Sequence, residues 1–254
     1  MSKSFYIGRM GNKKDDIKYF KHLLPLDIKT IVEPFGGSFA VSRIVYNDEK
    51  YKKVISDTDD ELYELYTKPN DYIECYNKMV DARNSLIGEN GDMICEKTLD
   101  LVDKVFTNEK LKNNFKKARI IRGCIFNINK TPFQVPELKN YEFYNDDYLK
   151  VIKKYQHDKE AFIFLDPPYL FSDNSHYKEQ KKESGDYNHD NDSTVILINI
   201  LKAMENKKTK AKIMLVINRL KIIEYLFKNF KMEIYNKIYQ LGKKKAQHLI
   251  ITNY

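Results

Sequence analysis

The chain has 254 residues, a mass of 30.2 kDa and a formal net charge of +8, a size that suits one α/β domain with a modest insertion. The basic balance favours an acidic partner such as a nucleic acid. The three cysteines form no C-x-x-C pair and the five histidines are dispersed, so we expect neither a metal site nor a disulfide framework. Residues 1–20 lack an apolar targeting segment and no apolar run is long enough to span a membrane, which leads us to expect a cytoplasmic protein without a membrane partner.

Short apolar runs alternate with segments of helical period along the chain. The runs that predict strands are Thr30–Val32, Lys53–Ile55, Tyr141–Tyr144, Ala161–Leu165 and Lys212–Ile217. The segments that predict helices are Ser38–Tyr46, Asp59–Tyr66, Asp147–Tyr155, Thr194–Glu205 and Leu220–Lys228. Such alternation indicates the α/β class, with a mostly parallel, twisted sheet and helices on both of its faces. The last apolar stretches, Met232–Tyr239 and Gln247–Thr252, predict a closing antiparallel hairpin.

A long segment separates the second and third predicted strands. It runs from Lys68 to Asn140, roughly 70 residues, which is far more than one crossover helix needs. We therefore expect a catalytic domain formed by residues 1–67 and 141–254 and an inserted, mainly helical subdomain formed by residues 68–140. A second irregular stretch, Ser172–Ser193, is crowded with charged and small polar residues and predicts a loop.

The sharpest chemical signal is a strand that ends in a carboxylate, two prolines and an aromatic ring: Asp166, Pro167, Pro168 and Tyr169. Ligands of doubly wound sheets bind beyond the carboxyl ends of strands, so this tetrad would lie at a binding site. An adenine amino group is a poor nucleophile, and acceptors for its two N–H hydrogens would help it to react. Asp166 and the carbonyl of Pro167 would be those acceptors, held by the rigid Pro-Pro pair. Tyr169 would stack on an extruded base. The alternative is an ordinary strand end at an Asp-Pro turn.

A second signal is a turn of small residues between a predicted strand and a predicted helix, formed by Pro34, Phe35, Gly36, Gly37, Ser38 and Phe39. Glycines there let the backbone approach a ligand closely. The pattern is not the G-x-G-x-x-G fingerprint, which leaves a nucleoside cofactor without a pyrophosphate plausible. Asp57, after the next strand, stands where an acid can accept hydrogen bonds from ribose hydroxyls. The alternatives are a plain tight turn for the glycines and a helix N-cap for Asp57.

Together these residues resemble the Dam-type, D12 class DNA adenine-N6 methyltransferases, over nearly the whole chain. Asp166–Tyr169 matches the catalytic D-P-P-Y of that family, and Glu33–Phe39 looks like its F-x-G-x-G cofactor loop. The order of cofactor loop, recognition insertion and D-P-P-Y is that of the alpha group, whose members methylate adenine N6 in DNA. The resemblance implies a Rossmann-like methyltransferase fold, S-adenosylmethionine as cofactor and flipping of the target base out of double-stranded DNA.

The resemblance assigns further residues to the cofactor, with Asp166 also counted among its contacts. An N-terminal motif is matched by Arg9, Met10, Gly11 and Lys13, of which Lys13 would lie near the methionine moiety of the cofactor. Asp147 and Tyr148 match the segment that holds the cofactor adenine, and we prefer Asp147 over Asp146 for that contact. Leu249–Tyr254 looks like the characteristic final strand of the family.

In the insertion, the resemblance points to a segment that enters the major groove of DNA. The residues expected to contact DNA there are Arg122, Asn127, Asn129 and Lys130. A structural role in the same hairpin is equally open for Arg122 and Asn127. The lysine runs Lys181–Lys182 and Lys243–Lys245 are expected to contact phosphates, with a solvated charged face as the alternative.

The chain departs from the family pattern at four places, one of which is the hairpin around Ile128–Thr131, shorter than in the best-known members. Phe39 stands where the second glycine is usual, Arg9 where an aromatic residue often precedes the glycine, and Gln247 with His248 where an acid is expected. Two rival functions share the same fold. One is a non-catalytic nucleic-acid-binding partner, and the other is methylation of adenine in RNA or of cytosine N4, because a D-P-P-Y site suits any conjugated exocyclic amine.

Overall fold

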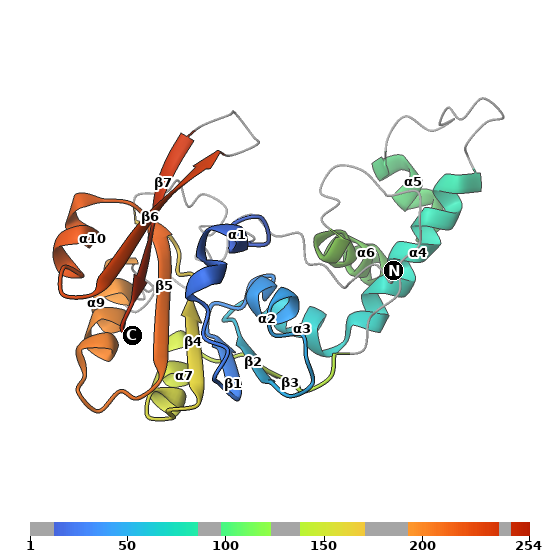
Figure 1. Cartoon of the computed structure of the whole chain (residues 1–254). Coiled ribbons are helices and arrows are strands. Elements are labelled where there is room, and N and C mark those ends of the chain that lie inside the picture. The colour runs from blue at the N-terminus through green and yellow to red at the C-terminus, as the bar shows by residue number, and fades with distance from the viewer. Residues whose placement is uncertain (1–12, 86–97, 123–137, 171–192, 239–244) are drawn as a thin grey trace.

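The computed structural model describes residues 13–85, 98–122, 138–170, 193–238 and 245–254. Within these ranges one seven-stranded sheet has the strand order β3-β2-β1-β4-β5-β7-β6. Its strands are β1 (Thr30–Glu33), β2 (Lys52–Ser56), β3 (Tyr141–Tyr144), β4 (Ala161–Leu165), β5 (Lys212–Asn218), β6 (Lys231–Ile238) and β7 (Lys245–Thr252). Strands β1 to β5 pair in parallel, whereas β7 is antiparallel to both β5 and β6 (Figure 1). The predicted mostly parallel sheet with a closing antiparallel hairpin is confirmed.

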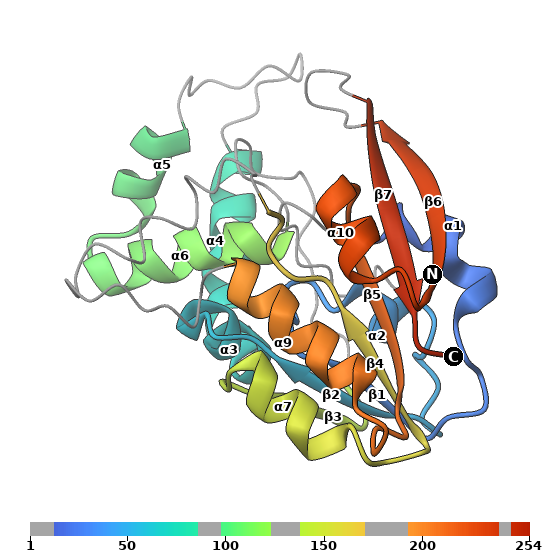
Figure 2. The same ribbon diagram turned by 90° about the vertical axis from the view of Figure 1, so that its left-hand side faces the viewer.

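Helices cover both faces of the sheet. They are α1 (Ile17–Phe20) with the short 3-10 helix η1 (Lys21–Leu23), α2 (Ala40–Ile44), α3 (Asp60–Thr67), α7 (Tyr148–Tyr155), α9 (Ser193–Glu205) and α10 (Lys221–Leu226). Figure 2 looks onto the face that α7, α9 and α10 cover, with α1 behind the sheet. No helix of the described ranges is both long and apolar enough to cross a membrane.

The alternation of side chains along the strands divides the core into two layers. In β4, Ile163 and Leu165 pack with buried residues of α7 and α9, such as Ile152 and Ile200. Phe162 and Phe164 point to the opposite face, where Phe164 stacks on Phe20 of α1 with ring centroids 5.5 Å apart. Because neighbouring residues of a strand face opposite sides, β4, which is apolar at every position, is buried on both faces.

Between β2 and β3, the described residues continue after α3 with three more helices: α4 (Pro69–Ser85), α5 (Thr98–Val105) and α6 (Glu109–Arg122). Their buried side chains, among them Tyr76, Phe106 and Phe115, form one cluster with Ile55 of β2 and Leu65 of α3. The helical character of this segment agrees with the sequence. Its division from the rest of the chain as a target-recognition subdomain remains a prediction.

Helix ends differ from the sequence prediction where the backbone leaves the helical region. The predicted helix Ser38–Tyr46 is shorter in the structure, because Phe39 has φ 37° and ψ 46° in the left-handed region and cannot belong to a right-handed helix. Leu220 is extended and precedes α10, and Phe227 caps its end, so the predicted Leu220–Lys228 is too long.

Candidate active site

The carboxyl ends of β1, β2, β3 and β4 lie along one edge of the sheet, because these strands run parallel. Strand β1 pairs with β2 on one side and with β4 on the other, so the chain order of the strands reverses at β1. Ligands of open α/β sheets bind outside the carboxyl ends of strands at such a switch point. The glycine turn follows β1 and the D-P-P-Y tetrad follows β4, so the two segments start from neighbouring strands.

The glycine turn is fastened to the end of β2. The amide of Gly36 donates to the carbonyl of Ser56 at 2.7 Å. A Cβ atom on Gly36 would lie 2.6 Å from Cγ2 of Ile55, so the close approach that this glycine permits is to β2. Gly37 has φ 47°, a left-handed conformation that favours glycine. Both glycines therefore have a structural reason, and the turn they form is held against the next strand.

Phe39 shows how the chain replaces the second glycine of the family pattern. Its backbone keeps a left-handed conformation, which costs an ordinary side chain about 1 kcal/mol. Its ring is 1% exposed and meets the rings of Tyr66, Tyr141 and Phe143 edge-on, at centroid distances of 5.3, 5.6 and 5.9 Å. Burial of the ring offsets the strained backbone. The buried ring of Phe39 thus anchors the glycine turn to α3 and β3.

Asp57, at the end of β2, joins the turn to the following helix. Its Oδ2 accepts from the amide of Gly37 at 2.9 Å, and its Oδ1 accepts from the amide of Asp59 at 3.1 Å. The N-cap of α3 is Asp59, which accepts from Glu61 and Leu62, so the alternative of Asp57 as N-cap is wrong. The two carboxylate oxygens of Asp57 thus hold backbone amides of the glycine turn and of the residue that caps α3.

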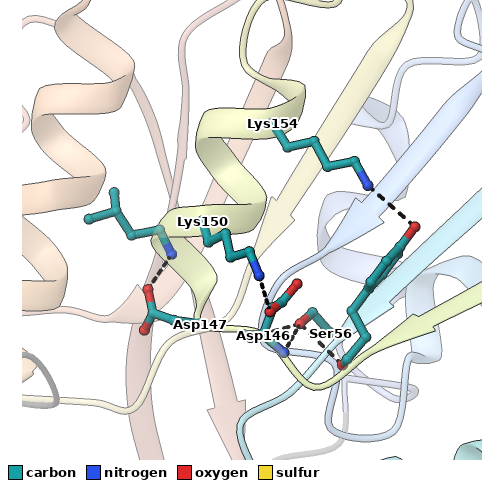
Figure 3. A network of polar contacts seen from close by, with 7 residues as sticks. Ser56, Asp146, Asp147, Lys150 and Lys154 are labelled. Atoms are coloured by element: carbon teal, nitrogen blue, oxygen red, sulfur yellow. Dashed lines mark hydrogen bonds and ion pairs between the residues drawn. The ribbon is translucent and has the colours of Figure 1, made fainter.

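The end of β3 places two acids side by side (Figure 3). Asp146 pairs with Lys150 at 2.6 Å, and its backbone carbonyl accepts from the Ser56 hydroxyl at 2.8 Å. Asp147 caps α7 by accepting from the amide of Leu149 at 2.8 Å, and among the described residues it forms no ion pair. Asp147 thus differs from Asp146 in having no cationic partner among the described residues, and the preference for it as the cofactor contact stays a prediction.

Aromatic stacking links the ends of β1 and β3. Phe35 of the glycine turn stacks on Tyr148, with ring centroids 5.1 Å apart and ring planes 22° apart. Tyr148 is 5% exposed, and its hydroxyl accepts from the side chain of Asn199 in α9 at 2.9 Å. Tyr148 therefore packs against the glycine turn, and a hydrogen bond from α9 fixes its hydroxyl group.

The tetrad begins with a carboxylate that is largely removed from water. Oδ2 of Asp166 accepts from Nζ of Lys13 at 2.6 Å, and the two side chains are 19% and 5% exposed. Burial raises the pKa of Asp166, the charge and hydrogen bond of Lys13 oppose that rise, and nearby Asp16 adds to it. Oδ1 of Asp166 is buried and has no hydrogen-bond partner among the described residues. One oxygen is thus fixed by a cation while the other is a buried acceptor without a donor.

The rest of the tetrad surrounds this carboxylate. Pro167 is buried, whereas Pro168 and Tyr169 are half-buried. The ring of Tyr169 has Lys13 Nζ 5.4 Å from its centroid and the ring of His248 at 5.4 Å on β7. The sequence-predicted residues Lys13, Asp166 and Tyr169 therefore meet in space, although Lys13 is 153 positions from Asp166.

A groove with a volume of about 1060 Å³ starts beside Lys13. It runs between the start of α1, with the residues just before it, and the end of β6 with the beginning of β7. Its lining residues are Lys14, Asp15, Asp16, Lys18, Tyr19, Asn236, Lys237, Ile238, Lys245, Ala246 and Gln247. Within it, Lys237 pairs with the buried Asp16 at 2.6 Å. Lys18 and Lys245 are exposed. A smaller concavity of about 470 Å³ lies on α7 and includes none of the tetrad residues.

Comparison with known proteins assigns the chain to a family. The family described as D12 class N6 adenine-specific DNA methyltransferase matches residues 10–92 and 93–241. The chain belongs to this family. It is also similar to the Type II methyltransferase M.CviBI of Paramecium bursaria Chlorella virus NC1A, with 26% identity over 273 residues that cover 96% of this chain and 97% of the relative. The resemblance seen in the sequence is confirmed, and the protein is an enzyme that methylates adenine N6 in DNA.

Some residues that the sequence assigns to this methyltransferase lie outside the described residues. They are Arg9, Met10 and Gly11 at the N-terminus, Asn127, Asn129 and Lys130 in the insertion, and Lys181, Lys182, Lys243 and Lys244 in the lysine runs. Arg122 is the last residue of α6, but its side chain lies outside the part of the chain that the structure describes. Within the described residues, no group of three or more histidine, cysteine or acidic side chains could hold a metal ion.

Glu33 is a residue of the site that the sequence names only as part of a motif. It ends β1, is 3% exposed and accepts from the amide of Ser42 at 2.7 Å. Burial, reinforced by the charge of Asp166, raises the pKa of Glu33 to about 7, although hydrogen bonding with Ser42 and the charge of Arg43 act in the opposite direction. An acid inside an otherwise apolar strand is the signal that could have singled it out.

The raised pKa of Glu33 predicts a dependence of stability on pH. Below the ordinary pKa of 4.5, Glu33 is protonated in both the folded and the unfolded state. Between about pH 4.5 and 7 the unfolded state releases the proton while the folded state keeps it, and above about 7 both states are ionised. This group therefore lowers the free energy of unfolding as pH rises. Glu33→Gln should stabilise the protein relative to wild type more at about pH 8 than at about pH 5. Denaturant unfolding at both pH values checks this, with Glu205→Gln at an exposed position as control. An unchanged difference at the two pH values would contradict the assigned pKa.

Proposed function

We propose that this methyltransferase transfers a methyl group from S-adenosylmethionine to adenine N6 of double-stranded DNA, with Asp166 as the acceptor for one hydrogen of the amino group. The observation that carries the proposal is the state of the Asp166 carboxylate. Lys13 holds Oδ2, whereas Oδ1 is buried and lacks a donor among the described residues. A buried acceptor without a donor costs free energy, and an adenine N–H would satisfy it.

The proposed cofactor fits the residues at the carboxyl edge of the sheet. Asp57 and Asp147 follow adjacent strands and offer acceptors, as a nucleoside with hydroxyl and amino donors requires. The turn Pro34–Phe39 lies between these acids and the tetrad by strand order, and Arg9 to Lys13 is proposed to complete the site. S-adenosylmethionine, when bound, supplies an electrophilic methyl group on a sulfonium.

The residues of the chain act by orientation and by hydrogen bonding. Asp166 and the carbonyl of Pro167 accept the two amino hydrogens, which draws the nitrogen lone pair out of conjugation with the ring and toward the methyl donor. Pro168 restricts the backbone that carries both acceptors. No strong base is needed, because the amine proton becomes acidic as the new N–C bond forms, and Lys13 keeps Asp166 ionised so that it can accept.

Tyr169 is proposed to hold the target base outside the duplex. An adenine inside a base pair cannot reach a carboxylate that is largely buried, so the base must be extruded. The partly exposed ring of Tyr169 adjoins Asp166 in the chain and offers a stacking face next to the acceptor.

Substitution of Asp166 tests this assignment. Asp166→Ala and Asp166→Asn should lower the single-turnover rate by at least roughly 10²–10³-fold, because they remove or weaken the acceptor of the reacting group. DNA affinity should stay close to that of wild type. The measurement uses labelled cofactor and DNA, followed by digestion to nucleosides and quantification of N6-methyladenine.

A matched control is Asp27→Asn, which removes a carboxylate paired with Lys212 at 2.5 Å on an exposed part of the molecule. This control should methylate DNA like wild type. A near-normal rate for Asp166→Ala would show that the carboxylate has no part in the chemistry.

DNA is proposed to lie across the carboxyl edge of the sheet. In Figure 1 the helices α4, α5 and α6 stand on one side of this edge, and the free ends of β6 and β7 stand on the other. The insertion, residues 68–140, would read the sequence with Arg122, Asn127, Asn129 and Lys130. The groove would take the phosphate backbone, since it carries exposed lysines and begins at Lys14, next in the chain to the Lys13 that pairs with Asp166.

Salt dependence tests the phosphate contacts. Replacing Lys18 and Lys245 together by alanine should weaken DNA binding and reduce the slope of log affinity against log salt concentration by about one per lysine. The control replaces Lys207 and Lys208, which are exposed in the loop that precedes β5 at the opposite edge of the sheet. Fluorescence anisotropy at several salt concentrations measures the slope. An equal change of slope in both double variants would mean that only net charge matters and that the groove is not a DNA contact.

A further inference from the structure

His248 is a buried histidine next to the tetrad that the proposed chemistry does not use. It lies on β7, opposite Asn218 at the end of β5 and opposite Tyr235 of β6, and it is 0% exposed. Strand β5 runs parallel to β4, and its Leu215 pairs with Leu165, the last residue of β4. Asn218 therefore lies beyond the carboxyl end of β4. His248 is therefore at the same carboxyl edge of the sheet as Asp166 and Tyr169.

The imidazole of His248 is part of a row of rings. Its centroid is 5.4 Å from that of Tyr169, at 47° between ring planes, and 5.1 Å from that of Tyr235, at 43°. Tyr235 in turn stacks on Tyr19 with centroids 4.8 Å apart. Tyr169 is half-buried, whereas His248 and Tyr235 are buried. The row thus runs from the half-buried Tyr19 through two buried rings to the partly exposed ring proposed to receive the base.

The surroundings keep this imidazole uncharged. Burial, together with the charges of Lys13 and Lys237, lowers the pKa of His248 to about 4, while Asp16 acts in the opposite direction. A neutral ring adds no second positive charge next to Lys13 and Asp166. A carboxylate at this position, which the family pattern leads one to expect at residue 247 or 248, would be a second anion near the same lysine.

We propose that His248 is a positioning residue that holds the ring of Tyr169 in the orientation needed to stack on the extruded adenine. The proposal rests on the stacking role of Tyr169 given above. In physical terms, a flat ring fixed by β5 and β6 on either side limits the rotation of the tyrosine ring that it contacts. Its contribution is to the geometry of the base and not to proton transfer.

A double-mutant cycle tests the proposal. His248→Gln keeps a neutral, hydrogen-bonding side chain without a ring and should lower the single-turnover methylation rate by about three- to tenfold, the size of one aromatic contact. His248→Phe keeps a ring and should restore the rate to within about twofold. In the Tyr169→Ala background, His248→Gln should have no further effect, because the ring that it positions is gone.

The readouts separate positioning from folding. Each variant is compared by thermal unfolding, by cofactor affinity and by the fluorescence of a DNA probe. The probe carries 2-aminopurine in place of the adenine that the enzyme methylates, and sequencing of modified bases first locates that adenine. His157→Gln, an exposed histidine at the far end of α7, is the control. If His248→Gln does not fold, His248→Leu takes its place as the variant that fills the site without a ring.

The outcomes distinguish this inference from the function on which it rests. A wild-type rate in Tyr169→Ala would overturn the stacking role of Tyr169 and with it the inference. A slow Tyr169→Ala variant in which the loss from His248→Gln remains fully additive would overturn the inference alone. A wild-type rate and unchanged 2-aminopurine fluorescence in folded His248→Gln would do the same.

Discussion

The buried ion pair between Lys13 and Asp166 is the interaction on which the rest of the site depends. It joins the start of the described chain to the end of β4, across 153 positions of sequence. Burial alone would favour a protonated Asp166, and a protonated acid would offer its hydroxyl as a donor where the reaction needs an acceptor. Lys13 supplies the opposing charge, and it also lies by the ring of Tyr169. One cation thus acts on both residues proposed to contact the target base.

The sheet gives this pair its setting. Because β1 lies between β2 and β4, the turn Pro34–Phe39, Asp57 and the tetrad all emerge from adjacent strands. Phe39 links the turn to α3 and β3, since its ring is buried among Tyr66, Tyr141 and Phe143 while its backbone forms part of the turn. The hydroxyl of Tyr66 also donates to the carbonyl of Gly37. The proposed cofactor loop and the helices that precede the proposed DNA-reading segment are therefore packed as one unit.

The sequence is informative wherever local pattern decides structure. The strands Ala161–Leu165 and Tyr141–Tyr144 have the bounds that the sequence predicts. For Ala161–Leu165 the reason is that a buried parallel strand needs apolar residues on both faces. The positions of Asp166 and of the glycine turn follow from the strands that precede them. Asp57 was expected after the second strand for the same reason, although its partners, the amides of Gly37 and Asp59, could not be read from spacing.

Contacts between distant segments are what the sequence does not contain. Nothing near Glu33 in the chain announces that it is buried beside Asp166, and nothing near His248 announces that it meets Tyr169. The left-handed backbone of Phe39 is equally hidden, because a phenylalanine does not prefer that conformation and is held there by three rings from two other elements, α3 and β3.

The most direct test of the ion pair is the pH dependence of the single-turnover rate at saturating cofactor. Asp166 must be ionised to accept, so the rate should rise with pH through the pKa of this group. Replacement of Lys13 by methionine removes the cation that lowers that pKa, and the acid limb of the profile should move to higher pH. Lys29→Met, which removes an exposed lysine paired with Glu160, should leave the limb in place. An acid limb at the same pH in wild type and Lys13→Met would contradict the central role of the pair.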